Sequence, residues 1–298
     1  YFLASIFIFS IIAFAYIRYT TPVYSVSSTL LIRDDNNTQL GAENILEGME
    51  LFSGKTNINN EIVVLKSFSL INQVVNDLGL GVSYFQHGFL QSNELYQNTP
   101  FLVKVDSNYH QILNSEFRIK IIDEKTYNLS CSIDDLHTYD LKTDRLNKNT
   151  SVNIDIDDNF KFGQQIKTKF FSFKLVKSQA FNINSILENE KDFSFILHQK
   201  SKLVAKYIEA VAINPINKET SVLKLKINGE NPGKSIDFLN KLNEKYIDYG
   251  LNDKNNMAIN TISFIDEQLS LIKDSLLIIE NNLEQFKRKH PNIENIEE

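Results

Sequence analysis

The sequence has few of the residues on which several protein classes depend. Among its 298 residues there is 1 Cys, 5 Pro, 10 Gly and no Trp. The single Cys131 excludes a disulfide framework and any cysteine-built zinc or iron–sulfur site. Lys and Arg number 31 against 37 Asp and Glu, and the net charge of −6 argues against broad binding to nucleic-acid phosphates. We therefore expect no nucleic-acid partner.

The apolar content, in contrast, is high enough for an ordinary folded core. Hydrophobic residues make up 42% of the chain, and 21 residues are Phe. This composition is too rich for a disordered chain. The length allows one large domain or two smaller ones.

The N-terminal run Tyr1–Ile17 contains no charged residue. As a helix it would reach roughly 25 Å, slightly less than a hydrocarbon core of roughly 30 Å. We expect a membrane helix over residues 1–19, cut at its N-terminal end. A cleaved signal peptide is one alternative, because Ala13–Ala15 has a small-x-small pattern, and a buried core helix is another. The side chains expected in the membrane are Phe2, Ile6, Phe9, Ile12 and Tyr16.

The segment after the apolar run alternates between strand and helix patterns. Val23–Arg33 is rich in Val, Tyr, Thr and Ile and predicts a strand. The polar stretch that follows predicts a loop with a short helix over Ala42–Phe52. Helical spacing of apolar residues then predicts one helix over Asn57–Leu78, which Gly79 would end.

From about residue 81 to 195 the pattern changes to short β-like runs separated by polar turns. Such spacing predicts a sandwich or barrel-like module. A short helix over Ser201–Tyr207 follows, and then a strand pair over Ala210–Ile213 and Ser221–Ile227. The runs expected as strands of the module are Phe101–Val105, Phe117–Ile122, Thr126–Cys131, Val152–Ile156, Phe170–Val176 and Phe193–Leu197.

The last segment carries the strongest pattern in the sequence. Asn231 followed by Pro232 predicts a helix start, and Gly250 is a point where the helix could kink or break. Beyond it, apolar residues alternate spacings of three and four, which is typical of a coiled-coil seam. A helix of this length must pair with a return segment or with a neighbouring subunit, unless it lies on its own domain. The seam residues are Ile262, Ile265, Leu269, Ile272, Leu276, Ile279, Leu283 and Phe286.

No catalytic or cofactor-binding pattern emerges from the sequence. Gly229–Ser235 resembles a phosphate-binding loop, but its two glycines are one residue too close, so we interpret it as a capped helix start. The five histidines show no paired spacing, which disfavours a metal site. Cys131 lies in a β-like run and is interpreted as a buried small side chain rather than a nucleophile. We expect no enzyme activity in this chain, no cofactor and no metal.

Several short motifs, in order, resemble the Wzz/Wzc-type chain-length determinant family of polysaccharide co-polymerases. The resemblance covers about residues 1–80 and 200–290. The stretch from 81 to 200 departs from the shorter regulators and is similar to the larger periplasmic regions of the autokinase-linked and export-linked branch of Bacteroidota-like bacteria. The residues that carry the resemblance are Pro22, Tyr24, Asn60, Glu61, Leu65, Ser67, Pro232, Asn240 and Tyr246.

The resemblance implies an α+β fold with three parts beyond the anchor, the first of which is made from two segments of the chain. These are an α/β base over 20–80 and 201–230, an inserted β-rich module over 81–200, and a coiled-coil arm over 231–298 that we expect to be cut at its end. Family members sit in the bacterial inner membrane with their bulk in the periplasm and assemble into rings, often octamers. They set polysaccharide chain length or couple synthesis of capsule or exopolysaccharide to export.

The same resemblance implies particular partners: other copies of the chain, the inner membrane, a polysaccharide polymerase and an outer-membrane export protein. Many members carry a cytoplasmic tyrosine autokinase, but no Walker motif occurs in these 298 residues. Two other functions fit the pattern of elements. One is a periplasmic adaptor of a secretion or efflux system, in which a β module normally resumes after the coiled coil. The other is an extracytoplasmic sensor that uses the β-rich module.

Overall fold

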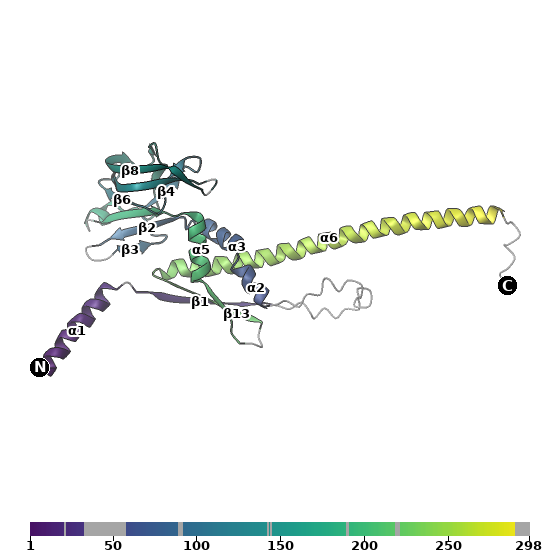
Figure 1. The fold of residues 1–298 in the computed structure, drawn as a ribbon, viewed down its shortest axis with the longest axis horizontal. Helices are drawn as coiled ribbons and strands as arrows, with labels where there is room; N and C mark the ends of the chain where they lie inside the picture. Colours follow the sequence, from purple (N-terminus) through teal and green to yellow (C-terminus); the bar gives the residue numbers. More distant parts are fainter. Residues whose placement is uncertain are drawn as a thin grey trace. The chain divides into compact units, whose positions relative to one another are not determined.

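The computed structural model describes residues 1–20, 22–32, 58–88, 92–141, 143, 145–188, 191–217 and 221–289. Over these residues the chain is α+β, with many strands and a long C-terminal helix (Figure 1). The helix predicted over Ala42–Phe52 lies outside the described residues. The chain divides into two compact units, Tyr1–Lys245 and Tyr246–Glu298.

A three-stranded antiparallel sheet forms the first part of unit one. Its order is β1 (Tyr24–Leu31), β13 (Val222–Gly229) and β12 (Ala212–Pro215), and Tyr24 is paired with Gly229. In β13 every second side chain is buried, as expected for a sheet with one face on a core. Because β1 pairs with a strand almost two hundred residues later, two distant parts of the chain complete this sheet.

The helix predicted over Asn57–Leu78 is wrong in one respect, because the structure has two helices there. They are α2 (Ile58–Leu65) and α3 (Phe68–Asp77). Ser67 separates them, since its Oγ accepts a hydrogen bond from the Leu70 N–H at 3.3 Å and caps α3. Periodicity alone did not reveal this cap.

The predicted stop at Gly79 is confirmed. Gly79 has a φ of 63°, a conformation that costs a glycine little. Its N–H donates to the Asn76 carbonyl at 3.0 Å, and the Leu80 N–H donates to the Val75 carbonyl at 3.0 Å. These two bonds form a Schellman motif, which ends α3 and turns the chain toward the β-rich module.

Helix α5 (Lys200–Ala210) packs beside α3 and completes the helical side of the base. It is longer than the helix predicted over Ser201–Tyr207, and its last residue, Ala210, was expected in the following strand. The Tyr207 ring stacks on Phe238 with centroids 4.5 Å apart. The buried side chains of this layer include Leu65, Leu70, Ile71, Val74, Val75, Leu203, Val204, Phe238, Leu239 and Leu242.

The inserted β-rich module contains two further sheets. One has seven strands in the order β3-β2-β11-β6-β7-β5, with β8 paired to β7, and the other has three in the order β4-β10-β9. A short helix, α4 (Ile183–Glu188), precedes β11. The strands are β2 (Val82–His87), β3 (Ser92–Leu95), β4 (Phe101–Val105), β5 (His110–Gln111), β6 (Glu116–Ile121), β7 (Thr126–Asp140), β8 (Arg145–Lys161), β9 (Gln165–Lys167), β10 (Ser172–Lys177) and β11 (Asp192–Leu197).

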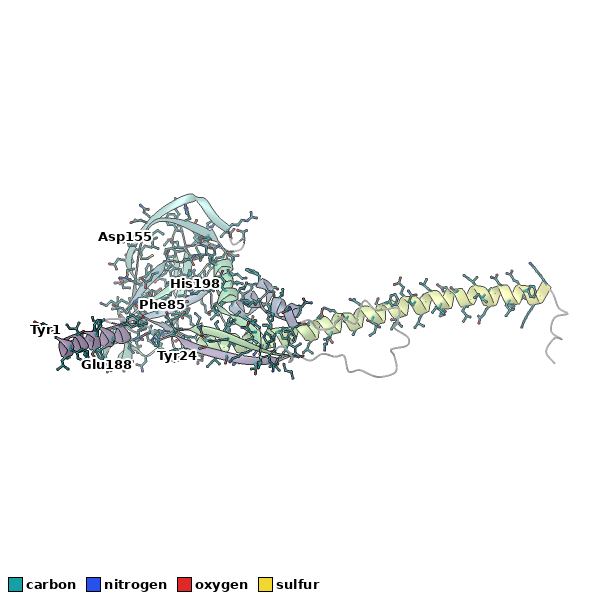
Figure 2. All side chains as sticks on the ribbon, turned by 60° about the horizontal axis from the view of Figure 1, so that its bottom comes forward. Tyr1, Tyr24, Phe85, Asp155, Glu188 and His198 are labelled. Carbon is teal, nitrogen blue, oxygen red and sulfur yellow. The ribbon has the colours of Figure 1, made fainter. Side chains whose placement is uncertain are left out.

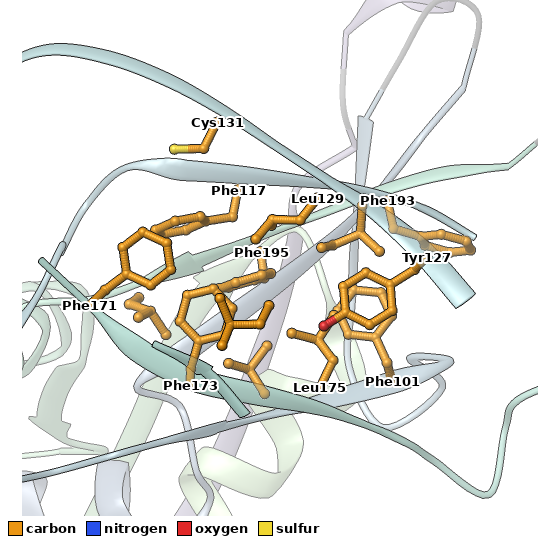
Figure 3. Packing of buried hydrophobic residues seen from close by; sticks show 14 of the residues in the cluster. Phe101, Phe117, Tyr127, Leu129, Cys131, Phe171, Phe173, Leu175, Phe193 and Phe195 are labelled. Atoms are coloured by element: carbon orange, nitrogen blue, oxygen red, sulfur yellow. The ribbon is translucent and has the colours of Figure 1, made fainter. Parts of the chain in front are cut away.

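Aromatic side chains join the two sheets of the module (Figure 3). Phe117 on β6 is fully buried and stacks on Phe195 of β11, with ring centroids 5.0 Å apart. Phe173 is on β10 of the other sheet and Phe171 directly precedes that strand. Their rings meet the Phe117 ring edge-on, with centroids 5.3 and 5.4 Å away. Such a cluster buries a large apolar area and fixes the spacing between the sheets. Cys131 is buried beside it, as predicted.

Helix α6 (Pro232–Lys289) has 58 residues. Its predicted start is confirmed, because Asn231 Oδ1 accepts a hydrogen bond from the Lys234 N–H at 3.1 Å. Gly229, just before the start, leaves room for Ser235, whose Oγ would lie 2.8 Å from a Cβ at that glycine. The helix runs without a break through Gly250, so a break at that residue is not found.

Candidate functional site

The N-terminal helix α1 (Phe2–Tyr19) exposes the apolar side chains that the sequence assigned to a membrane. Phe2, Phe9 and Tyr16 are the most exposed of the five, at 78%, 66% and 71%, and Ile6 and Ile12 are also exposed. Figure 2 shows side chains standing out around this helix, which begins next to the labelled Tyr1. In the part of the chain that the structure describes, no helix is both long enough and apolar enough to cross a membrane.

The motif residues of the first part of the base occupy structural positions. Pro22 is exposed ahead of β1, and Tyr24 is the first residue of that strand. Leu65 is fully buried at the end of α2, and Ser67 caps α3. Asn60 and Glu61 lie in the first turns of α2. The structure does not gather these residues into one chemical site.

The motif residues of the second part lie along α6. Pro232 is its first residue, Asn240 is exposed, and Tyr246 is half-buried. The same stretch of α6 is tied to the base by two contacts that the sequence did not suggest. Asn243 Nδ2 donates to Ser28 Oγ of β1 at 2.7 Å, and Lys245 Nζ lies 2.7 Å from Asp77 Oδ2 of α3. This contact with Lys245 lowers the pKa of the Asp77 carboxyl.

A polar network joins the β-rich module to the start of α6. Lys234 Nζ lies 2.6 Å from Glu94 Oε1 of β3, and both side chains are only 17% exposed. One turn further along, Asp237 Oδ2 accepts hydrogen bonds from the Tyr96 hydroxyl at 2.9 Å and from Gln97 Nε2 at 2.7 Å. Burial, followed by the bond to Asp237, raises the pKa of Tyr96 to about 12.

These contacts settle the role of the glycine-containing segment Gly229–Ser235. Its lysine is held by Glu94 and its asparagine caps a helix, so the interpretation as a capped helix start agrees with the geometry. The network itself was missed at the sequence level. Glu94 lies in a polar run with no periodicity, and its partner is 140 residues away along the chain.

His198, which is labelled in Figure 2, directly follows β11 and extends the network into the seven-stranded sheet. Its Nε2 lies 2.9 Å from Ser83 Oγ, and that hydroxyl donates to Glu94 Oε1 at 3.0 Å. Burial lowers the pKa of the His198 imidazole, and the nearby positive charges of Lys234 and Lys206 lower it further. The imidazole is therefore neutral in the folded protein at pH 7.

This lowered pKa predicts a pH dependence of stability. As the pH falls below the ordinary histidine value of 6.5, the unfolded chain binds a proton that folded His198 still resists. The free energy of unfolding should therefore fall from that pH down to the lowered pKa and be unaffected by His198 above it. His198→Gln should make this loss shallower in urea unfolding at a series of pH values. The exposed His110→Gln is the control, and equal slopes for both variants and the parent chain would refute the prediction.

The predicted seam of α6 is exposed along its whole length. Every described residue from 251 to 289 is exposed, and the eight seam residues range from 49% for Ile265 to 63% for Ile272. Burial of such apolar area is the main driving force for helix association. The surface has the composition of an interface and lies open in the single chain.

A second apolar stripe lies beside the seam and was missed at the sequence level. Its members recur every seven residues. Phe264 lies about 100° around the helix from Ile265, since each residue of an α-helix turns the chain by that angle. Their exposed fractions lie between 46% and 61%. Their recurrence every seven residues was the sequence signal that could have revealed this stripe. The members of this second stripe are Met257, Phe264, Leu271 and Ile278.

Comparison with models of known protein families finds a similarity in the first part of the chain. The model of the family described as chain length determinant protein (Wzz) matches residues 1–78. Over these residues the chain is similar to that family. The match supports the Wzz/Wzc-type polysaccharide co-polymerase family for this chain. It ends at the last residue before Gly79, so it covers α1, β1, α2 and α3.

Members of the Wzz family share several properties. Wzz proteins act in polysaccharide chain-length determination, and the Wzz domain is non-enzymatic. They are associated with the inner membrane, with their bulk in the periplasm, and generally act as oligomers with polysaccharide machinery. Within the described residues no group of three or more His, Cys, Asp or Glu side chains is placed to hold a metal ion.

Proposed function

We propose that this protein is the periplasmic scaffold of an inner-membrane polysaccharide co-polymerase. In this proposal it forms a ring of identical subunits that regulates the chain length or the export of a capsular polysaccharide or exopolysaccharide. The observation that carries the proposal is the open seam of α6 in a chain whose residues 1–78 match the Wzz family model. The remaining features support parts of it.

Assembly is supported by the two apolar stripes of α6. A helix with one seam can pair with a single neighbour, whereas a second apolar stripe about 130° from the middle of the seam allows contact with a neighbour on another side. The first seam starts at Ile262, and the second passes through Phe264 and Leu271. A closed ring is the arrangement in which every subunit makes both contacts.

Anchoring at the inner membrane is supported by the uncharged run Tyr1–Ile17 and by the exposed apolar side chains of α1. The base would then hold the subunits at the bilayer through β1 and the packed helices α3 and α5. The polar network around Glu94 and Asp237 fixes the start of α6 to the β-rich module, so both would be held on the same base. The partners in this proposal are a polysaccharide polymerase or an outer-membrane export protein.

Polymer length in cells tests the proposed function. Deleting the gene should broaden the length distribution of the surface polysaccharide on a gel, and the gene supplied on a plasmid should restore a narrow distribution. An empty plasmid is the control. Unchanged polymer length and unchanged polymer amount at the cell surface after deletion would contradict the proposal.

A further inference from the structure

A pocket of about 440 Å³ lies at one end of the β-rich module, where parts of both sheets meet. One side is the turn between β6 and β7, and the other is formed by the end of β8 and the end of β10. Its lining combines apolar residues with three lysines and one glutamate. The main lining residues are Phe162, Gly163 and Val176, with Lys125, Lys161 and Lys177 around them.

Backbone hydrogen bonds hold the three segments of this lysine pocket together. The Phe162 N–H donates to the Lys125 carbonyl at 2.9 Å, and the Gly163 N–H donates to the Leu175 carbonyl at 2.7 Å. Asp123 Oδ1 accepts from the N–H groups of Lys125 and Thr126 at 2.6 and 2.8 Å. These bonds also keep the pKa of Asp123 low. The pocket is therefore built on ordered turns.

Aromatic rings position one of the three cations. Lys177 Nζ lies 4.5 Å from the ring centroid of Phe181 and 5.9 Å from that of Phe162. At these distances the faces of the aromatic rings attract the ammonium group electrostatically and favour its position beside them. Gly163 has a φ of 82° and no heavy atom within 4 Å of the place where a Cβ would be, so the pocket stays open on that side.

The local charge is opposite to that of the whole chain. The pocket has three lysines and one acid, Glu124, which gives a local charge of +2 in a chain of net charge −6. Another pocket among the described residues of the module has the same volume, but its cations Arg118 and Lys120 are balanced by Asp157 and Asp192. The lysine pocket is thus the one with an electrostatic preference for an anion.

We propose that the lysine pocket binds carboxylate-bearing sugar residues of the polymer. A uronic acid has a carboxylate for the lysines and a C–H face for the Phe162 ring, which is half-buried. This proposal rests on the proposed function, because it names the chemical class of the polysaccharide that the protein would meet. It gives the β-rich module a binding role beside the scaffold role of the base and α6.

Binding of defined oligosaccharides by the purified chain tests the proposal. The probes are a galacturonate hexamer and an uncharged maltohexaose, each titrated at low and high salt. The chain should bind galacturonate with an affinity that falls with salt. Lys161→Glu with Lys177→Glu should weaken that binding by about tenfold, which corresponds to about 1.4 kcal/mol. Lys161→Arg with Lys177→Arg should retain it.

Arg118→Glu with Lys120→Glu is the matched control, because it makes the same charge change in the other pocket of the same module. It should leave the affinity for galacturonate within about twofold of the parent chain. Equal binding of maltohexaose, no binding of galacturonate, or equal losses in both reversed pairs would overturn the proposal. The result is separable from the polymer-length test, since a gene that controls polymer length could encode a module that binds no galacturonate.

Discussion

Leu269→Asp combined with Leu276→Asp is expected to dissociate the assembly of this protein. Both residues lie in the exposed seam of α6, at 58% and 53% exposure in the single chain. Burying two carboxylates in a helix interface removes apolar contacts and leaves charges without partners. Truncation of one buried Leu alone costs about 2–5 kcal/mol, so the double change should weaken association at least a thousandfold, which is about 4 kcal/mol.

Sedimentation velocity of the detergent-purified protein measures this effect. Ser270→Asp combined with Ser275→Asp is the matched control, because it adds the same charges to the same helix outside the seam. The control should sediment like the parent, and the seam variant should sediment as a single subunit. If both variants sediment alike, α6 does not hold the assembly together by this seam.

Phe117→Ala is expected to have the largest effect on the stability of the β-rich module. Phe117 is fully buried and contacts rings from both sheets, namely Phe195 on one side and Phe171 and Phe173 on the other. Its removal leaves a cavity that the two sheets cannot close without moving. Changes of this kind cost about 3–5 kcal/mol of the free energy of unfolding.

Urea unfolding followed by circular dichroism measures this loss, and tyrosine fluorescence is a second probe in a chain without Trp. Phe68→Ala is the control, because it makes the same chemical change at a side chain that is 50% exposed on α3. It should cost no more than about 0.5 kcal/mol. Similar losses in the two variants would show that the ring cluster does not hold the two sheets together.

Local signals in the sequence predicted a large part of the fold. The cap at Asn231, the stop at Gly79 and the strand Phe101–Val105 depend on residues close together in the chain, and the structure agrees with each. The interruption at Ser67 was missed because apolar spacing continues across it. β7 and β8 were predicted much too short, because the parts of both strands next to their connecting turn are rich in polar residues.

The candidate sites also divide into those formed by residues close together in the sequence and those formed by distant segments. The seam of α6 was predictable because its residues follow one another at a fixed spacing, and the structure places them on an open face. The Lys234–Glu94 pair and the lysine pocket were not predictable, because each joins segments far apart in the sequence. Lys125, Lys161 and Lys177 meet only after two sheets have packed together.

The central claim is that several copies of this chain form one scaffold, and the mass of the detergent-purified protein tests it most directly. Native mass spectrometry or mass photometry at low concentration measures the number of subunits in each particle. The account predicts one dominant species whose mass is a whole-number multiple of the subunit mass, corresponding to a closed ring. A single subunit at every concentration at which the protein remains folded would contradict it.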